Sequence, residues 1–292
     1  MRIGITGATG FIGNEIATLA LAQEHQAIRY SRNPTTSMRA YDGNAAHTVD
    51  YSNLDALVHL AGESIVGRWT KSRKKAIRTS RIDATRQLVE GISLAENGPK
   101  TLVCASAIGY YGDTENREVN ELSARGEGFL AEVCEDWEEA ASLAVPHGIR
   151  VVHARFGMVL GRAGGAYPLM ERIFSMGLGG RLGDGQQWMS WIDVRDAARL
   201  LLHACQDSRA DGALNVVSDN PVRNEEFTRI LAASLGRKAL LPVPGFAVKM
   251  ALGGMSELVL SSQRVEPAKA RMLGFEWKYP TLEECLGSLE EV

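Results

Sequence analysis

The sequence begins with a short apolar run, residues 2 to 6, that leads directly into a glycine-rich turn. The turn places Gly7, Gly10 and Gly13 at three-residue spacing, and an apolar stretch continues from it to Leu21. This order predicts a strand, a tight turn and a helix, which is the context that a dinucleotide-binding glycine motif requires. Gly7 permits the sharp turn, Gly10 lets the backbone approach a pyrophosphate, and Gly13 lets the helix pack closely on the strand.

The first turn of the predicted helix has free N–H groups that suit phosphate oxygens. The alternative is a turn that is tight for structural reasons alone. Under the nucleotide-binding interpretation, the residues of this segment that contact the cofactor are Gly7, Thr9, Gly10, Phe11, Ile12 and Gly13.

The end of the second predicted strand, residues 27 to 31, distinguishes NAD from NADP. NAD sites normally carry an Asp or Glu there, which accepts hydrogen bonds from the ribose hydroxyls. This chain has Ser31 and Arg32 instead. A hydroxyl and a guanidinium suit the extra phosphate of NADP, although an arginine at a strand end is also often a plain surface charge. The pattern favours NADP over NAD.

Buried-strand patterns alternate with helical patterns along the first two thirds of the chain. Helices are expected through Leu21, over residues 70 to 95 and after Glu127. The remaining strands are expected at residues 47 to 49, 56 to 60, 101 to 105, 150 to 156 and 213 to 217. This alternation predicts an α/β fold, a doubly wound Rossmann-type parallel sheet whose ligands bind beyond the carboxyl ends of its strands.

A smaller discontinuous C-terminal lobe is predicted beside the sheet. Residues 1–160 form the dinucleotide-binding domain, and residues 188–220 return to it. Residues 161–187 are rich in glycine and residues 221–292 read as helices interrupted by prolines, so we assign these two segments to a substrate-side lobe.

The composition narrows the class of protein. The net charge of −3 gives no general attraction to nucleic acid. No apolar run is long enough to span a membrane and no leader pattern precedes the first strand, so a cytoplasmic protein without membrane or nucleic-acid partners is expected. The four cysteines and six histidines show no ligand spacing, and we predict no metal site.

One segment carries a concentration of positive charge. Residues 68 to 81 carry seven lysines and arginines on a stretch with a helical pattern. A solvated helix face is the plainest interpretation, and attraction of an anionic cofactor or substrate is the alternative.

Two later strand ends are expected to complete the cofactor pocket. Met158 follows the strand at residues 150 to 156 and is placed to contact the nicotinamide, unless it only packs against neighbours. The small residues after residue 59 let a ribose pass the backbone, and the carboxylate of Glu63 can accept from a ribose hydroxyl. The predicted contacts there are Leu60, Ala61, Gly62 and Glu63.

These motifs, with Ser106, the segment Tyr110 to Gly112 and the segment Ser190 to Asp193, resemble the extended short-chain dehydrogenase/reductases of the NAD-dependent epimerase/dehydratase type. The segments His59 to Glu63 and Gly157 to Gly165 resemble more narrowly the subfamily of epimerase family proteins, also labelled cell-division-inhibitor-like. The resemblance covers essentially the whole chain. It implies an NADP-dependent oxidoreductase or epimerase that transfers hydride, and pairing into a homodimer.

The resemblance also implies a Tyr-x-x-x-Lys pair on the helix that contains Trp137, where the lysine lowers the pKa of the tyrosine and holds the ribose. This chain offers Phe129 with Val133, or Leu130 with Cys134, under the two nearby registers. Neither pair can move a proton.

The remaining candidate catalytic residues are Ser106, which matches the family's serine, and Tyr110 and Tyr111. In the family a tyrosine at the Tyr-Gly step is usually structural or lines the substrate site, so proton transfer by either one is the less favoured alternative. The resemblance places Arg155, Trp188 and Trp191 on the substrate side, where tryptophans stack on sugar or base faces. The alternative is that both tryptophans pack the lobe against the sheet.

These observations predict an NADP-binding oxidoreductase or epimerase that acts by hydride transfer on a polar or nucleotide-linked small molecule. The absent tyrosine and lysine motivate a rival hypothesis, a non-catalytic NADP sensor or regulatory protein. A structural protein that interacts through the basic helix ranks below both.

Overall fold

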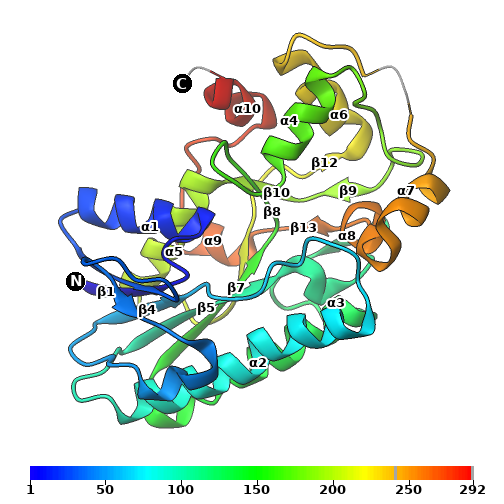
Figure 1. Ribbon diagram of the computed structural model, residues 1–292. Coiled ribbons are helices and arrows are strands. Elements are labelled where there is room, and N and C mark those ends of the chain that lie inside the picture. The colour runs from blue at the N-terminus through cyan, green and yellow to red at the C-terminus, as the bar shows by residue number, and fades with distance from the viewer. Residues whose placement is uncertain (240–241, 291–292) are drawn as a thin grey trace.

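A seven-stranded parallel sheet forms the centre of the computed structural model, which describes residues 1–239 and 242–290 (Figure 1). In spatial order its strands are β11 (Gly212–Val216), β7 (Arg150–Phe156), β5 (Thr101–Ala107), β4 (Ala56–His59), β1 (Arg2–Thr6), β2 (Gln26–Ser31) and β3 (Arg39–Ala40). The predicted doubly wound Rossmann-type sheet is confirmed.

Helices cover both faces of the sheet. Helices α1 (Phe11–Ala22) and α5 (Val194–Gln206) pack together on one face, and α2 (Lys71–Leu94) and α3 (Phe129–Ser142) pack together on the other (Figure 1). Each face has its own apolar core. The central strands β1, β4 and β5 are almost entirely buried and consist mostly of apolar residues, as parallel strands covered on both faces do.

The order of the strands reverses between β1 and β4. From β1 the chain moves to β2 and β3 on one side, and from β4 it moves to β5, β7 and β11 on the other. Thr6 and His59 are aligned across this boundary. The crevice beyond the carboxyl ends of these two strands is the topological switch point, where such sheets bind ligands.

The prediction of a strand at residues 47 to 49 is wrong. The chain forms a 3-10 helix there, η1 (Gly43–Thr48), which the Asp42 side chain caps by accepting a hydrogen bond from the N–H of Asn44. The third strand of this half is β3, a two-residue edge strand that pairs with β2. Periodicity over three residues does not separate a strand from a helical turn.

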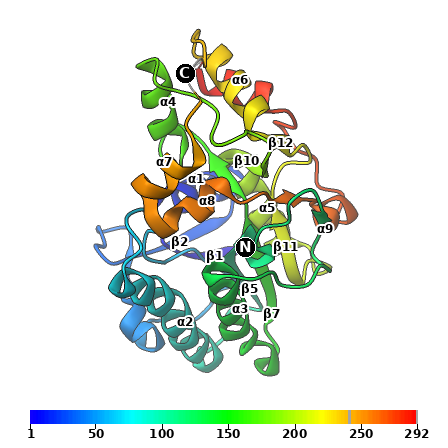
Figure 2. The same ribbon diagram turned by 90° about the vertical axis from the view of Figure 1, so that its right-hand side faces the viewer.

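A third apolar core joins the two segments assigned to the lobe. It packs α4 (Tyr167–Ser175) with α6 (Asn224–Ser234) and α10 (Leu282–Glu290), beside the antiparallel pair β9 (Trp188–Met189) and β12 (Val222–Arg223) (Figure 2).

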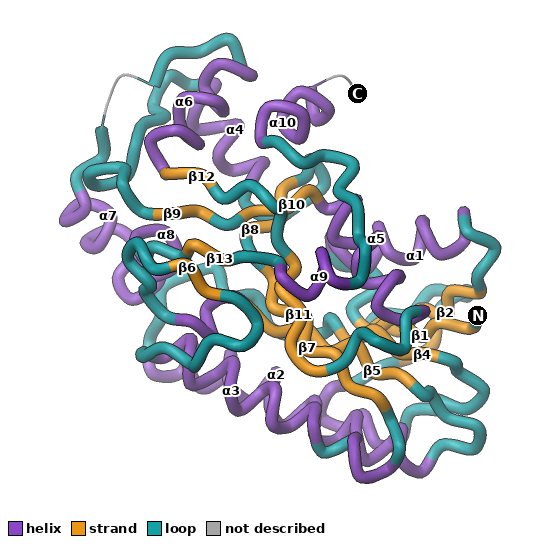
Figure 3. Tube along the Cα trace, turned by 180° about the vertical axis from the view of Figure 1, so that it is seen from behind, coloured by secondary structure: helices purple, strands orange, loops and turns teal. Residues whose placement is uncertain are grey.

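Part of the C-terminal segment lies against the sheet instead. Leu273 and Phe275, which follow α9 (Ala268–Met272), belong to the core over α1 and α5. The strand β13 (Arg264–Val265) pairs with β6 (Glu118–Val119), and β10 (Trp191–Asp193) pairs with β8 (Met158–Leu160) (Figure 3).

The other short helices are α7 (Gly245–Leu252), α8 (Glu257–Leu260), η2 (Ile108–Tyr111), η3 (Val145–His147) and η4 (Gly253–Ser256). Within the described residues, none of the helices combines the length and the apolar character needed to cross a bilayer.

Candidate functional site

The glycine turn adopts the backbone that its sequence predicts. Gly7 has φ +70°, and a Cβ on Gly7 would lie 3.0 Å from the carbonyl carbon of Leu60 at the end of β4. A Cβ on Gly13 would lie 2.3 Å from the carbonyl oxygen of Gly7. Only a residue without a side chain allows α1 to approach the turn this closely.

The N-terminus of α1 is open. Gly10 is the N-cap in extended conformation and makes no side-chain cap. The N–H groups of the first turn therefore point beyond the end of β1 without intrahelical partners, and the helix dipole favours negative charge there. This arrangement fits the diphosphate of a dinucleotide.

The side chain of Phe11 has a structural role. Its ring lies against the segment that follows β8, where a Cβ on Gly161 or Gly164 would come within 2.7 Å or 2.9 Å of a ring atom. Glycine in this part of residues 161–187 thus lets the chain close over α1. The contact of Phe11 with the cofactor stays a prediction.

Arg29 is a supporting residue that the sequence analysis missed. Its guanidinium donates to the carbonyl oxygen of Ala8 and to Oδ1 of Asn14, both at 3.0 Å. It therefore ties β2 to the glycine turn. The available signal was a charged residue inside an otherwise buried strand pattern.

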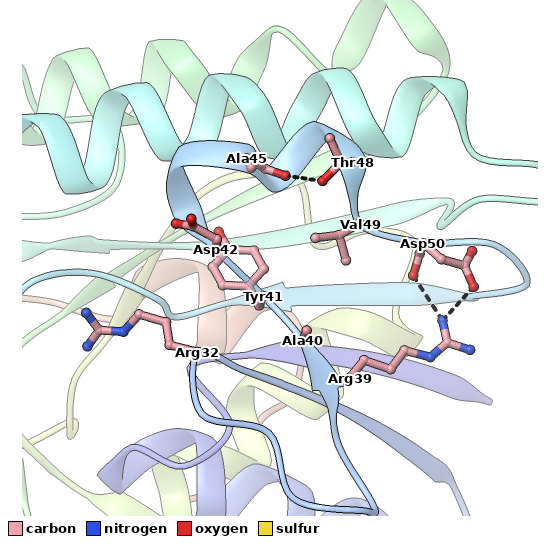
Figure 4. A pocket seen from close by; sticks show the side chains of 9 residues that line it. All are labelled: Arg32, Arg39, Ala40, Tyr41, Asp42, Ala45, Thr48, Val49 and Asp50. Atoms are coloured by element: carbon pink, nitrogen blue, oxygen red, sulfur yellow. Dashed lines mark hydrogen bonds and ion pairs between the residues drawn. The ribbon is translucent and has the colours of Figure 1, made fainter.

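Ser31 and Arg32 lie at the carboxyl end of β2. Ser31 is buried and accepts a hydrogen bond from the N–H of Asn33 at 3.2 Å. Arg32 is exposed and lines a cavity of about 490 Å³ together with Arg39 (Figure 4). Arg39 is already bonded to Asp50, with Nη1 3.1 Å from Oδ2. Arg32 is therefore the better placed of the two arginines to meet a phosphate on the adenosine ribose.

The residues after β4 form the other wall of the crevice. The backbone of Leu60 and Ala61 lies against Gly7, as expected for a narrow passage. The carboxylate of Glu63 accepts a hydrogen bond from Nη1 of Arg73 at 2.8 Å. A ribose hydroxyl that donates a hydrogen bond to Glu63, as predicted, would therefore compete with Arg73 for the carboxylate.

A buried polar network lies beyond the ends of β5 and β7. Ser106 and Arg155 are aligned on these adjacent strands. Both contact the carboxylate of Glu138 on α3: Ser106 donates to Oε1 at 2.7 Å, and Arg155 donates through Nε and Nη2 at 2.8 Å each. The predicted substrate contact of Arg155 is wrong for this arrangement, because its buried guanidinium is held inside the protein.

Tyr111 belongs to the same network. It is buried, accepts a hydrogen bond from Nη1 of Arg155 at 2.9 Å and donates to Oδ1 of Asn215 at 2.8 Å. Burial raises the pKa of Tyr111 to about 12, although the Arg155 cation opposes this rise. A phenol so placed is not available for proton exchange with a substrate, which corrects the assignment of Tyr111 as catalytic.

Tyr110 differs from its neighbour. It is half-buried, and its ring centroid lies 3.5 Å from Cζ of Arg155. Within residues 1–239 and 242–290 its hydroxyl has no hydrogen-bond partner. Tyr110 is thus oriented by a stacked cation while its hydroxyl stays free.

The geometry of α3 favours one of the two registers considered for the Tyr-x-x-x-Lys pair. A Cβ on Gly109 would lie 3.2 Å from Cβ of Leu130 and 3.9 Å from Sγ of Cys134. Leu130 and Cys134 therefore face the end of β5. Phe129 lies instead against Trp69, with their ring centroids 5.5 Å apart.

The substrate-side tryptophans separate into two cases. Trp191 is fully buried and donates from Nε1 to the carbonyl oxygen of Asn220 at 2.9 Å. No face of its ring is free for a ligand, so its assignment to the substrate site is wrong and it packs the lobe. Trp188 is half-buried beneath the guanidinium groups of Arg223 and Arg264, and its contact with substrate stays a prediction.

Met158 is partly buried and packs against the core of the lobe. Its contact with a nicotinamide also stays a prediction.

The reversed strand order and the open glycine turn define a Rossmann-type nicotinamide dinucleotide-binding protein. The chain belongs to the NAD dependent epimerase/dehydratase family, whose model matches residues 3–217. Residues 243–289 match a domain of unknown function, DUF1731. The resemblance stated from the sequence is confirmed.

Relatives match the chain over its whole length. The epimerase family protein YfhF of Bacillus subtilis is 38% identical over 297 residues, covering 99% of this chain and 98% of that protein. The crystal structure of the human epimerase family protein SDR39U1 with NADPH has a TM-score of 0.94 and 33% identity, and the match covers 100% of both chains. NADPH is the form of dinucleotide that Ser31 and Arg32 predict.

A more distant structure shows the fold alone. The UDP-N-acetylglucosamine 4-epimerase from Bacillus cereus has a TM-score of 0.79 at 19% identity, covering 99% of this chain and 98% of that one.

Proposed function

We propose that this protein is an NADP-dependent oxidoreductase or epimerase that acts by hydride transfer on a polar or nucleotide-linked small molecule. Arg32 supports the choice of NADP, because its exposed guanidinium lies at the end of β2, where the adenosine ribose of a dinucleotide lies in this fold. The human relative crystallised with NADPH supports the same choice.

The observation that best supports a catalytic function is the free hydroxyl group of Tyr110. Of the three hydroxyls considered as catalytic, those of Ser106 and Tyr111 donate to Glu138 and Asn215. The Tyr110 hydroxyl alone among these three is free, and it lies beyond β5, on the half of the sheet that receives the nicotinamide.

The cofactor and the residues of the chain have separate roles in the proposed reaction. NADP(H), when bound, supplies the hydride donor or acceptor. Tyr110 holds or moves a proton at the substrate oxygen, and the Arg155 guanidinium stacked on its ring orients the phenol. Ser106 donates its proton to Glu138, so toward a substrate hydroxyl its oxygen acts as an acceptor.

A second function is favoured by a specific observation. Leu130 and Cys134 occupy the face of α3 that borders the end of β5, and neither side chain supplies a proton donor and cation of the usual kind. An NADP-binding sensor or regulatory protein needs the nucleotide site but no such pair.

Turnover distinguishes the two functions. Purified protein with NADPH is tested against carbonyl compounds and sugar nucleotides, and epimerisation is followed by product analysis because it consumes no net cofactor. An enzyme turns over at least one substrate and loses about 100-fold or more of its kcat in Tyr110→Phe, whereas Trp188→Phe serves as a test of substrate affinity. Tight NADPH binding without any turnover supports the sensor.

We also propose a cytoplasmic location and assembly into a homodimer. The four cysteines are unpaired and buried, as expected in a reducing compartment. Sedimentation at several protein concentrations tests the dimer.

A further inference from the structure

Arg81 on α2 lies against the backbone that follows β4. A Cβ placed on Gly62 would lie 3.7 Å from its Cζ, so the guanidinium covers the backbone directly after the strand. In a doubly wound sheet, β1, β2 and β3 receive the adenosine half of a dinucleotide, and β4 and β5 receive the other half. Arg81 therefore lies on the nicotinamide side.

The hydrogen bonds of Arg81 leave part of its guanidinium available. Nη1 donates to the carbonyl oxygens of Glu63 at 3.0 Å and Ile77 at 3.3 Å. Within the part of the chain that the structure describes, Nε and Nη2 have no protein acceptor, and neither is sealed from solvent.

Among residues 1–239 and 242–290, Arg81 forms no ion pair. Glu63, the carboxylate whose charge acts on the pKa of Arg81, is paired with Arg73 at 2.8 Å. Burial lowers the pKa of Arg81, and its Cζ lies 5.1 Å from the ring centroid of Trp137. A largely buried cation without an ionic partner is costly to the folded protein, and a ligand that completes its hydrogen bonds reduces this cost.

Arg81 also lies near the part of α3 that lacks the lysine of the Tyr-x-x-x-Lys pair. The thiol of Cys134 lies near Gly109, directly after β5, close to Ser106 and within electrostatic range of the Arg81 guanidinium. Cys134 is the residue that faces the site where a cation on α3 would hold the ribose. Arg81 supplies a guanidinium from the neighbouring helix α2, within electrostatic range of this position.

We propose that Arg81 binds the nicotinamide half of the dinucleotide, through its ribose hydroxyls, and so acts as the cation that α3 does not supply. The inference rests on the proposed NADP site and not on any turnover. Two free donors of a planar guanidinium suit a vicinal pair of hydroxyls.

The test compares two ligands by calorimetry: NADPH, and adenosine 2′,5′-bisphosphate, which carries the adenosine half and its phosphate but no nicotinamide ribose. Arg81→Met is expected to raise the Kd for NADPH about 10-fold and to leave the Kd for the bisphosphate unchanged. Arg81→Lys, which keeps the charge, is expected to recover part of the loss. The emission of bound NADPH reports the nicotinamide environment independently and is expected to shift in Arg81→Met.

Arg73→Met is the matched control, because Arg73 lies on the same helix and anchors the same loop through Glu63 and the carbonyl oxygen of Ser64. If Arg81 only fixes this loop, both variants weaken NADPH equally, and the proposal is overturned. An unchanged Kd for NADPH in Arg81→Met overturns it too, as does an equal loss for both ligands. Failure of the proposed reaction appears differently, as absent turnover with the affinity difference between the two ligands intact.

Discussion

The guanidinium of Arg155 and the carboxylate of Glu138 form a bidentate ion pair, with two N···O distances of 2.8 Å, inside the protein. The side chains are 5% and 11% exposed. Around this pair the protein arranges the hydroxyl of Ser106, the phenol of Tyr111 and the ring of Tyr110. The ion pair therefore links α3 to β7 directly beneath the proposed catalytic tyrosine.

Removing one partner of the ion pair should strongly destabilise the folded protein. Arg155→Met leaves the Glu138 carboxylate buried without its cation, and we expect a loss of about 3–5 kcal/mol in the free energy of unfolding. Urea denaturation measures it. The double variant Arg155→Met/Glu138→Met should be more stable than Arg155→Met, because it leaves no unpaired charge.

An exposed pair provides the comparison. Arg86 and Asp83 lie on α2 with N···O 3.8 Å, and both side chains are 56% exposed. Arg86→Met should change the free energy of unfolding by no more than about 0.5 kcal/mol. Comparable losses in Arg155→Met and Arg86→Met would contradict the role given to the buried pair.

Gly13→Ala should prevent normal closure of the nucleotide turn. The new Cβ would meet the carbonyl oxygen of Gly7 at 2.3 Å, and both are backbone positions that cannot rotate away. We expect a loss of about 1–3 kcal/mol in stability and a rise of about 10-fold or more in the Kd for NADPH. Thermal unfolding and calorimetry measure the two effects.

Gly287 offers the same substitution without the clash. It lies inside α10, and a Cβ there would meet no heavy atom within 4 Å. Gly287→Ala should leave cofactor binding unchanged and stabilise the protein by up to about 1 kcal/mol. If both alanine variants bind NADPH like the original protein, the packing assigned to Gly13 is unimportant for the site.

His59 predicts a dependence of stability on pH. It is fully buried at the end of β4, with Nδ1 2.7 Å from Oγ1 of Thr6, and burial lowers its pKa from 6.5 to about 4. Below pH 6.5 the unfolded chain binds a proton at this position that the folded chain does not. Its contribution to stability is therefore complete above pH 6.5 and is lost as the pH falls toward about 4.

Urea denaturation of the original protein and of His59→Gln checks this sign. Between pH 7 and pH 5 the original protein should lose about 2 kcal/mol more than the variant. His153, whose pKa burial also lowers, is present in both proteins and cancels in the difference. Equal losses in the two proteins would show that His59 does not titrate with unfolding.

The nucleotide half of the site was predictable because its signals are local. Gly7, Gly10 and Gly13 follow one another along the chain, and backbone sterics assign each a role. The same holds for Ser31 and Arg32, which lie where β2 ends. Arg29 escaped notice because its contacts with the glycine turn depend on how β2 lies beside α1, which no local pattern encodes.

The polar network at the ends of β5 and β7 was less predictable because it is assembled across strands. Ser106, Arg155 and Asn215 are aligned on β5, β7 and β11, and the carboxylate that joins two of them comes from α3. From the sequence Arg155 reads as a polar residue facing a ligand. Only the tertiary structure shows that Glu138 and Tyr111 already occupy its donors.

Arg32 should determine the preference for NADP over NAD. It lines the cavity at the end of β2 and takes part in none of the ion pairs found among the described residues, so its guanidinium is available to a phosphate on the adenosine ribose. Arg32→Ala should raise the Kd for NADPH and for adenosine 2′,5′-bisphosphate about 10- to 100-fold and leave the Kd for NADH unchanged. Arg39→Ala is the control within the same cavity, because Arg39 is bonded to Asp50 (Figure 4). If Arg39→Ala abolishes the preference for NADPH and Arg32→Ala does not, the phosphate binds at the other end of the cavity. Tighter binding of NADH than of NADPH by the original protein would refute the NADP assignment itself.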